Sequence, residues 1–146
     1  MPVTDDEVAA LRALLKDDIE GHKQLFARLD RGHAARGYTA LIAAAFGEAV
    51  LRRFGTNHTR AEVIEFVADA RSRSENLAAK IDPDAGERLI GAVLGEATTE
   101  GLSRQAKMSA QFLLLAALIA AEHLDDPGLD AFMSDARKLA DQLLAG

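Results

Sequence analysis

The chain has 146 residues, of which 49% are hydrophobic and 27% are charged, and its formal net charge is −6 at pH 7. These proportions are typical of a chain that folds on its own, and the length predicts a single domain over residues 1–146. There is no cysteine, which excludes disulfides, thiolate nucleophiles and cysteine-ligated metal sites. The negative charge argues against sequence-independent binding to nucleic acid. The acidic N-terminus lacks the pattern of a secretion signal, so we expect a cytoplasmic protein.

Helical spacing begins close to the N-terminus. Thr4 and Glu7 form an S/T-x-x-E capping box, and the apolar positions that follow predict one long helix over about residues 5–30. A short linker with two glycines comes next. A regular apolar face then predicts a second helix over about residues 38–54.

Capping signals divide the middle of the chain. Gly55 has the position of a C-cap, and Thr59 with Glu62 forms a second capping box, which predicts a helix over about residues 59–81. An Asp-Pro pair at residues 82–83 is typical of a helix start, and it predicts a helix that runs to about residue 94.

The most apolar helix is predicted over residues 104–124, after a polar loop at 97–103. Its segment 112–121 has no polar face, which is typical of the buried centre of a bundle. As a helix this segment is about 15 Å long, roughly half of a bilayer core, so we do not expect a membrane span. A second Asp-Pro pair at residues 126–127 then predicts a last helix to about residue 143.

No segment of four or more residues alternates between apolar and polar as a strand does. The sequence therefore predicts an all-α fold, a compact bundle of about six helices with the helix near 105–124 at its centre. The motif A-L-I-A-A occurs at 40–44 and 117–121, and F-x-x-D-A-R occurs at 66–71 and 132–137. These matches indicate either two pseudo-repeated three-helix units or chance similarity in an alanine-rich chain.

The most concentrated polar stretch is R-R-F-G-T-N-H-T-R at residues 52–60. Backbone N–H groups at a helix start, beside basic side chains, form a natural anion site. The residues that would bind a phosphate or carboxylate there are Arg52, Arg53, His58, Thr59 and Arg60. The alternative is a solvated loop in which Thr59 only caps its helix and Arg52 pairs with Glu48. No glycine-rich phosphate loop is present, and we expect no cofactor.

The four histidines are His22, His33, His58 and His123. None is paired at i, i+4 or in an H-E-x-x-H arrangement, so the sequence predicts no metal site. His22 shares a predicted helix face with apolar residues and should point at the core or at an interface. There it would either sense pH or meet a ligand, or simply donate to a nearby carbonyl or carboxylate.

No nucleophile, triad or acid–base pair stands in a catalytic context, so we expect a noncatalytic protein. The first hypothesis is interaction with another protein or self-association as a homodimer, through apolar faces of the 38–54 and 127–143 helices that exceed one core. The second is a bundle that binds an acidic or phosphate-bearing small molecule at residues 52–60. The third is a helix-turn-helix-like DNA-binding regulator, because the two helices predicted over residues 59–94 carry Arg60, Arg71, Arg73 and Lys80.

Overall fold

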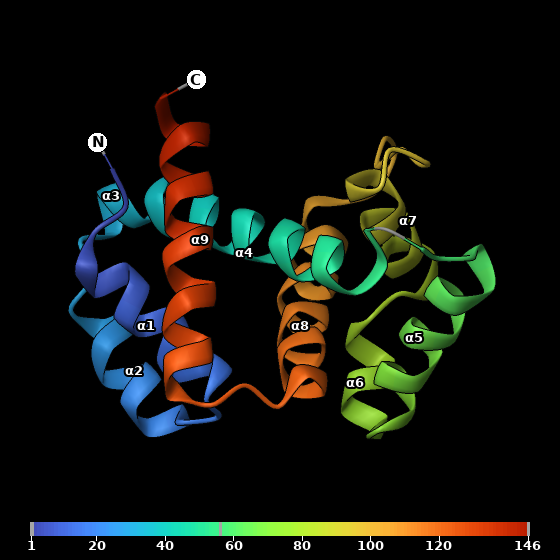
Figure 1. Cartoon of the computed structure of the whole chain (residues 1–146), viewed down its shortest axis with the longest axis horizontal. Helices are drawn as coiled ribbons and strands as arrows, with labels where there is room; N and C mark the ends of the chain where they lie inside the picture. The colour runs from blue at the N-terminus through green and yellow to red at the C-terminus, as the bar shows by residue number, and fades with distance from the viewer. Residues whose placement is uncertain (1, 56, 146) are drawn as a thin grey trace. The chain divides into compact units, whose positions relative to one another are not determined.

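The computed structural model describes residues 2–55 and 57–145. These residues form helices and no strand, which confirms the all-α prediction. In chain order the helices (Figure 1) are α1 (Asp5–Leu15), α2 (Ile19–Ala27), α3 (Arg31–Ala34), α4 (Gly37–Phe54), α5 (Arg60–Ser72), α6 (Glu75–Lys80), α7 (Pro83–Val93), α8 (Arg104–Glu122) and α9 (Asp126–Ala145). No helix in the described ranges has the length and apolar character needed to cross a membrane.

The chain divides into two compact units. The first consists of Met1–Glu48 with Ile119–Gly146, and the second of Ala49–Leu118. The boundaries fall inside α4 and α8, so each of these helices contributes residues to both units. This division does not follow the two three-helix halves that the internal motifs indicated. The pseudo-repeat and the single domain stay predictions.

The single helix predicted over 5–30 is wrong, because the structure breaks this segment twice. Asp17 adopts a left-handed conformation (φ 65°), which aspartate tolerates better than most residues, and this ends α1. Asp18 then caps α2 by accepting a hydrogen bond from the Gly21 N–H at 3.0 Å. Asp30 caps α3 in the same way through the N–H groups of Gly32 and His33. Short polar side chains that compete for backbone N–H groups explain both breaks.

The helix predicted over 59–81 is also divided, into α5 and α6, so the predicted count of six helices is too low. Ser74 caps α6 by accepting from the Leu77 N–H at 3.0 Å. The guanidinium of Arg71, near the end of α5, donates to the carbonyls of Ile81 at 2.8 Å and Ala78 at 3.1 Å. Arg71 thus satisfies carbonyl groups at the C-terminal end of α6 that have no partner inside the helix.

Other predicted helix starts are confirmed. Thr4 and Glu7 form the reciprocal capping box of α1, and Asp82 caps α7 with proline in the first turn. The carboxylate of Asp125 accepts from the Gly128 N–H at 2.8 Å and so begins α9. These positions follow from local hydrogen bonding alone, which is why sequence reasoning located them.

Polar contacts fix α1 antiparallel to α9 within the first unit. Asp141 accepts from the Val3 N–H at 2.7 Å, and Arg137 donates to the Val3 carbonyl at 2.7 Å, so the start of α1 lies beside the end of α9. At the other end of α1, Arg12 pairs with Asp130 at 2.6 Å and Lys16 pairs with Asp126 at 2.9 Å.

The apolar faces predicted for α4 and α9 are largely buried. Every predicted apolar position of α4, from Tyr38 to Phe54, is buried, and so are the main apolar positions of α9 apart from its last turn, where Leu143 is 57% exposed. The helix α8 buries its middle residues, including Leu114 and Leu118, but Ala120 is exposed. Phe112, Leu113 and Ala116 are half-buried as well, so the prediction of a helix buried on all sides is wrong.

We expect Arg71→Met to lower the free energy of unfolding by about 1–3 kcal/mol, because two carbonyl acceptors lose their charged donor. Urea unfolding followed by circular dichroism measures this change. Arg73→Met is the matched control, since Arg73 makes only an exposed ion pair with Asp69 and should change stability by less than about 1 kcal/mol. Equal effects of the two substitutions would contradict this role of Arg71.

Candidate functional site

The stretch at residues 52–60 joins the end of α4 to the start of α5. Thr59 is the N-cap of α5, and its hydroxyl accepts from the Glu62 N–H at 3.2 Å. Arg52, Arg53 and Arg60 are all exposed. The capping role of Thr59 is thus confirmed, while binding of a ligand by this stretch stays a prediction.

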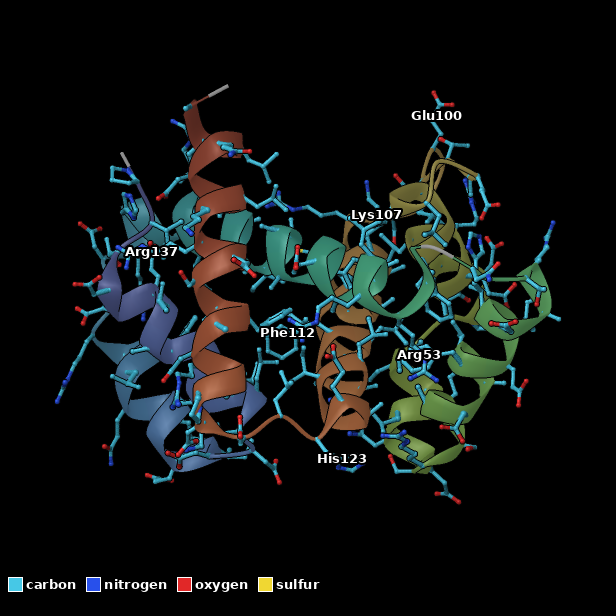
Figure 2. All side chains as sticks on the ribbon, in the orientation of Figure 1. Arg53, Glu100, Lys107, Phe112, His123 and Arg137 are labelled. Atoms are coloured by element: carbon cyan, nitrogen blue, oxygen red, sulfur yellow. The ribbon has the colours of Figure 1, made fainter. Side chains whose placement is uncertain are left out.

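Arg53 lies over aromatic rings rather than at the start of α5. Its guanidinium carbon is 4.8 Å from the centre of the Phe66 ring and 5.7 Å from that of Phe54. Arg53 is labelled in Figure 2. These are cation–π distances, and Phe66 lies in the second turn of α5. Both rings are buried, so Arg53 covers an aromatic surface at the edge of the core.

Both ring nitrogens of His58 have partners. Nδ1 donates to the Phe54 carbonyl at 2.8 Å, and Nε2 is 2.6 Å from a carboxylate oxygen of Glu96. A carbonyl and a carboxylate only accept, so the protonated imidazole satisfies both contacts. The hydrogen bond with Glu96 is the main cause that raises the pKa of His58 above 6.5. His58 therefore links the end of α4 to the segment after α7, and neither nitrogen is available to a ligand.

A groove of about 810 Å³ runs along α5, and we call it the α5 groove. Three of its lining side chains are acidic, Glu62, Glu65 and Asp69, and one is basic, Arg53. The other lining residues are Phe54, Phe66, Ala68 and Ser72. Asp69 is paired with Arg73 at 3.2 Å, but the carboxylates of Glu62 and Glu65 still outnumber the guanidinium of Arg53, so the groove favours a cation over an anion.

A second cavity, of about 340 Å³, lies beside Arg60. It is also lined by Arg88 and by the carboxylate-bearing residues Asp84, Glu87 and Glu96. Arg88 is already engaged, because it pairs with Asp84 and donates to the carbonyls of Thr98 and Glu100. Both cavities are large enough for a small ligand. In each of them an acidic ligand would meet more carboxylates than arginines.

His22, the other candidate, lies half-buried on α2. Its Nδ1 donates to the Ala10 carbonyl at 2.9 Å, and its ring lies 5.7 Å from that of Phe26. The sequence allowed two alternatives for His22, a role as a pH sensor or ligand contact and a simple hydrogen bond to a carbonyl or carboxylate. The structure contains this hydrogen bond, and the sensor or ligand role stays a prediction. Among residues 2–55 and 57–145, no group of three or more His, Asp or Glu side chains could hold a metal ion.

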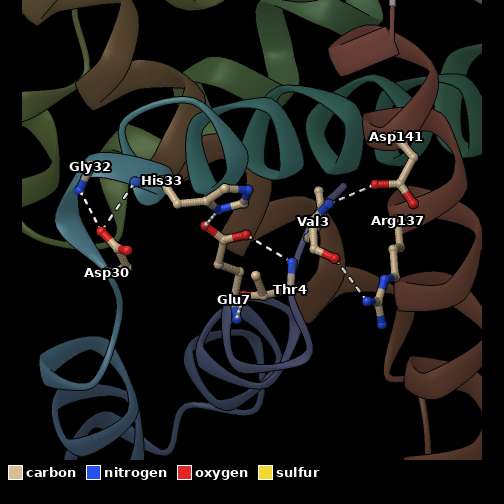
Figure 3. Close-up of polar contacts among 8 residues, drawn as sticks. All are labelled: Val3, Thr4, Glu7, Asp30, Gly32, His33, Arg137 and Asp141. Atoms are coloured by element: carbon tan, nitrogen blue, oxygen red, sulfur yellow. Dashed lines mark hydrogen bonds and ion pairs between the residues drawn. The ribbon is translucent and has the colours of Figure 1, made fainter. Parts of the chain in front are cut away.

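A buried polar cluster in the first unit was missed by sequence reasoning (Figure 3). The carboxylate of Glu7 is only 2% exposed, and it accepts from the Thr4 N–H at 2.9 Å and from Nδ1 of His33 at 3.1 Å. A Cβ atom at Gly37 would lie 2.6 Å from the His33 ring and 2.7 Å from the Glu7 carboxylate. The capping box located Glu7, but no sequence spacing links it to a histidine 26 residues away.

Two buried polar atoms have no hydrogen-bond partner in the described part of the chain, Nε2 of His33 in this cluster and the hydroxyl of Tyr38, the residue after Gly37. Burial, with a smaller contribution from Glu7, raises the pKa of Tyr38 to about 12. A carboxylate that holds one nitrogen of an imidazole orients it for proton transfer. Here, however, the second nitrogen is itself buried, so the cluster does not present a base to a substrate.

No protein-family model, curated protein or solved structure matches the chain.

We expect Glu96→Gln to bring the pKa of His58 back toward 6.5, because the amide does not stabilise the imidazolium as the carboxylate does. The contribution of this contact to stability is fully present below about pH 6.5, and it is lost as the pH rises through the raised pKa of the folded state. NMR titration of the histidine ring resonances measures the pKa. Glu100→Gln is the control, and an unchanged titration in Glu96→Gln would contradict the assignment.

Tyr38 is the only tyrosine in the chain, and there is no tryptophan, so tyrosinate absorbance reports this residue alone. We expect it to titrate near pH 12 in the folded protein. Because the pKa is 10.0 without burial, the native state should lose stability between about pH 10 and 12. Tyr38→Phe should remove this loss and raise the free energy of unfolding at pH 7 by about 1 kcal/mol. Titration of the folded protein near pH 10 would contradict burial of the hydroxyl.

Proposed function

We propose that the protein is noncatalytic and acts by binding a basic segment of a protein in the α5 groove. The observation that supports this most directly is the acidic lining of the groove. Glu62, Glu65 and Asp69 stand at i, i+3 and i+7 on α5, which places them on one face of the helix. All three are exposed. Asp69 already pairs with Arg73 at 3.2 Å, so the carboxylates of Glu62 and Glu65 are the ones open to an incoming Lys or Arg side chain.

The aromatic rings of Phe54 and Phe66, which line the α5 groove, add a second source of affinity. Arg53 already stacks on Phe66, which shows that the ring face accepts a guanidinium. A partner arginine that displaced or joined Arg53 would combine ring stacking with a carboxylate contact. Arginine is enriched at protein interfaces for this combination of planar stacking and bidentate hydrogen bonding.

The other hypotheses have less support. Interaction through the apolar faces of α4 and α9 is less favoured, because those faces are mostly buried. Binding of an acidic ligand is less favoured, because the carboxylates that line both cavities would repel it. DNA binding by residues 59–94 loses much of its basis, because Arg71 donates to backbone carbonyls, Arg73 pairs with Asp69 and Arg88 pairs with Asp84. The cytoplasmic location expected from the sequence remains part of the present proposal.

We expect a labelled oligolysine peptide to bind the full chain, and a matched oligoglutamate peptide not to bind, in a fluorescence anisotropy titration. The triple variant Glu62→Gln, Glu65→Gln, Asp69→Asn should weaken oligolysine binding by about tenfold or more, since charged contacts at one site are removed together. High salt should weaken it as well.

The matched control is Glu20→Gln, Glu75→Gln, Glu100→Gln, which removes the same charge from exposed positions outside the α5 groove. If the control variant lost affinity as strongly as the groove variant, the binding would reflect net charge and the proposal would be wrong.

A further inference from the structure

The first unit carries a local excess of positive charge in a chain whose net charge is −6. Four cationic side chains lie between residues 23 and 36, and we call this stretch the basic segment. They are Lys23, Arg28, Arg31 and Arg36, and all are exposed. The only carboxylate within the same stretch is Asp30, which caps α3 by accepting from the N–H groups of Gly32 and His33.

These cations have no partner of their own. Across residues 2–55 and 57–145, the structure contains no hydrogen bond or ion pair of the Lys23, Arg28, Arg31 or Arg36 side chains. This contrasts with Arg12 and Arg137 of the same unit, which pair with carboxylates. An exposed arginine without an internal partner loses little when it binds a carboxylate elsewhere.

Apolar surface lies beside these charges. The helix α2 contains no buried residue, and Ile19 and Phe26 are 47% and 50% exposed. Seven positions separate these two residues, so they share one face of α2. Exposed aromatic and arginine side chains together are the composition found at the centre of protein interfaces.

We propose that the basic segment of one copy of the chain docks in the α5 groove of a second copy. This inference rests on the proposed function, and it names the partner. The basic segment carries three arginines, and the α5 groove carries Glu62 and Glu65 together with Asp69, which is paired with Arg73, so the charges of the two surfaces are complementary. A contact that two copies make reciprocally closes a twofold dimer, whereas the same contact repeated head to tail forms an open chain of copies.

The association depends on local charge and not on net charge. Two copies with a net charge of −6 repel each other at long range, but the Debye length is about 8 Å at physiological salt, so contacts at the interface outweigh this repulsion. Pairs at the surface are individually weak, and the contact should therefore depend on protein concentration.

Reversal of charge on each surface tests the pairing in the full-length protein. The segment variant carries Arg28→Glu, Arg31→Glu and Arg36→Glu, and the groove variant carries Glu62→Lys, Glu65→Lys and Asp69→Lys. Analytical ultracentrifugation should show concentration-dependent association of the unmodified protein, with the dissociation constant of each variant alone raised about tenfold or more. An equimolar mixture of the two variants should associate again, because both contacts regain opposite charges.

Circular dichroism checks that both variants fold. If either is unfolded, the neutral set Arg28→Gln, Arg31→Gln and Arg36→Gln, paired with the groove variant Glu62→Gln, Glu65→Gln, Asp69→Asn, replaces them, and each should weaken association. A monomer at every concentration, or a dimer that neither set affects, would overturn the inference.

Two outcomes separate this inference from the proposed function. A monomer that still binds oligolysine in its α5 groove retains the proposed function and rejects the second copy as partner. Binding of duplex DNA at low salt, lost in the segment variant but kept in the groove variant, would assign the basic segment to nucleic acid and also overturn the inference.

Discussion

The buried carboxylate of Glu7 is the constraint on which the first unit depends. A carboxylate taken out of water without partners costs several kcal/mol, so the fold has to supply donors where Glu7 lies. It supplies the Thr4 N–H at the start of α1 and the imidazole of His33 on α3. Gly37, the first residue of α4, leaves the space that the pair occupies, since a Cβ there would overlap both side chains. One buried group thus requires three helix ends to meet.

Charge is neutralised unevenly over the molecule. On α9 the acidic side chains that face α1 are paired, and a hydrogen bond from Lys16 is the main cause that holds the pKa of Asp126 below its ordinary value. On α5 the carboxylates of Glu62 and Glu65 line a groove instead. Paired charges chiefly fix the packing of helices, whereas unpaired charges of one sign attract partners of the other sign. The distribution of pairs, more than the net charge, therefore distinguishes structural from binding surfaces.

Sequence reasoning succeeded where the cause was local. The caps at Thr4, Thr59 and Asp82, and the apolar face of α4, follow from spacings within a few residues. It failed where a single side chain overrode helical periodicity, as at Asp17, because the apolar pattern continues through the break. The candidate stretch at 52–60 contributed Arg53 to a groove, but the acidic lining comes from α5, and the contact of His58 with Glu96 joins residues 38 positions apart. Such contacts depend on tertiary packing and leave no motif.

The absence of buried residues in α2 has a consequence for its dynamics. The helix α2 packs against α1, but every one of its residues is at least partly exposed, so its amide hydrogens should exchange with solvent before those of α4, whose apolar face is enclosed. Isolated helices of nine residues are marginal in water, and α2 has that length. Any partner that covers Ile19 and Phe26 would therefore select and order this helix as it binds. Part of the interaction free energy then goes into ordering α2. Substitutions that stabilise this helix should therefore raise the affinity, and substitutions that destabilise it should lower the affinity.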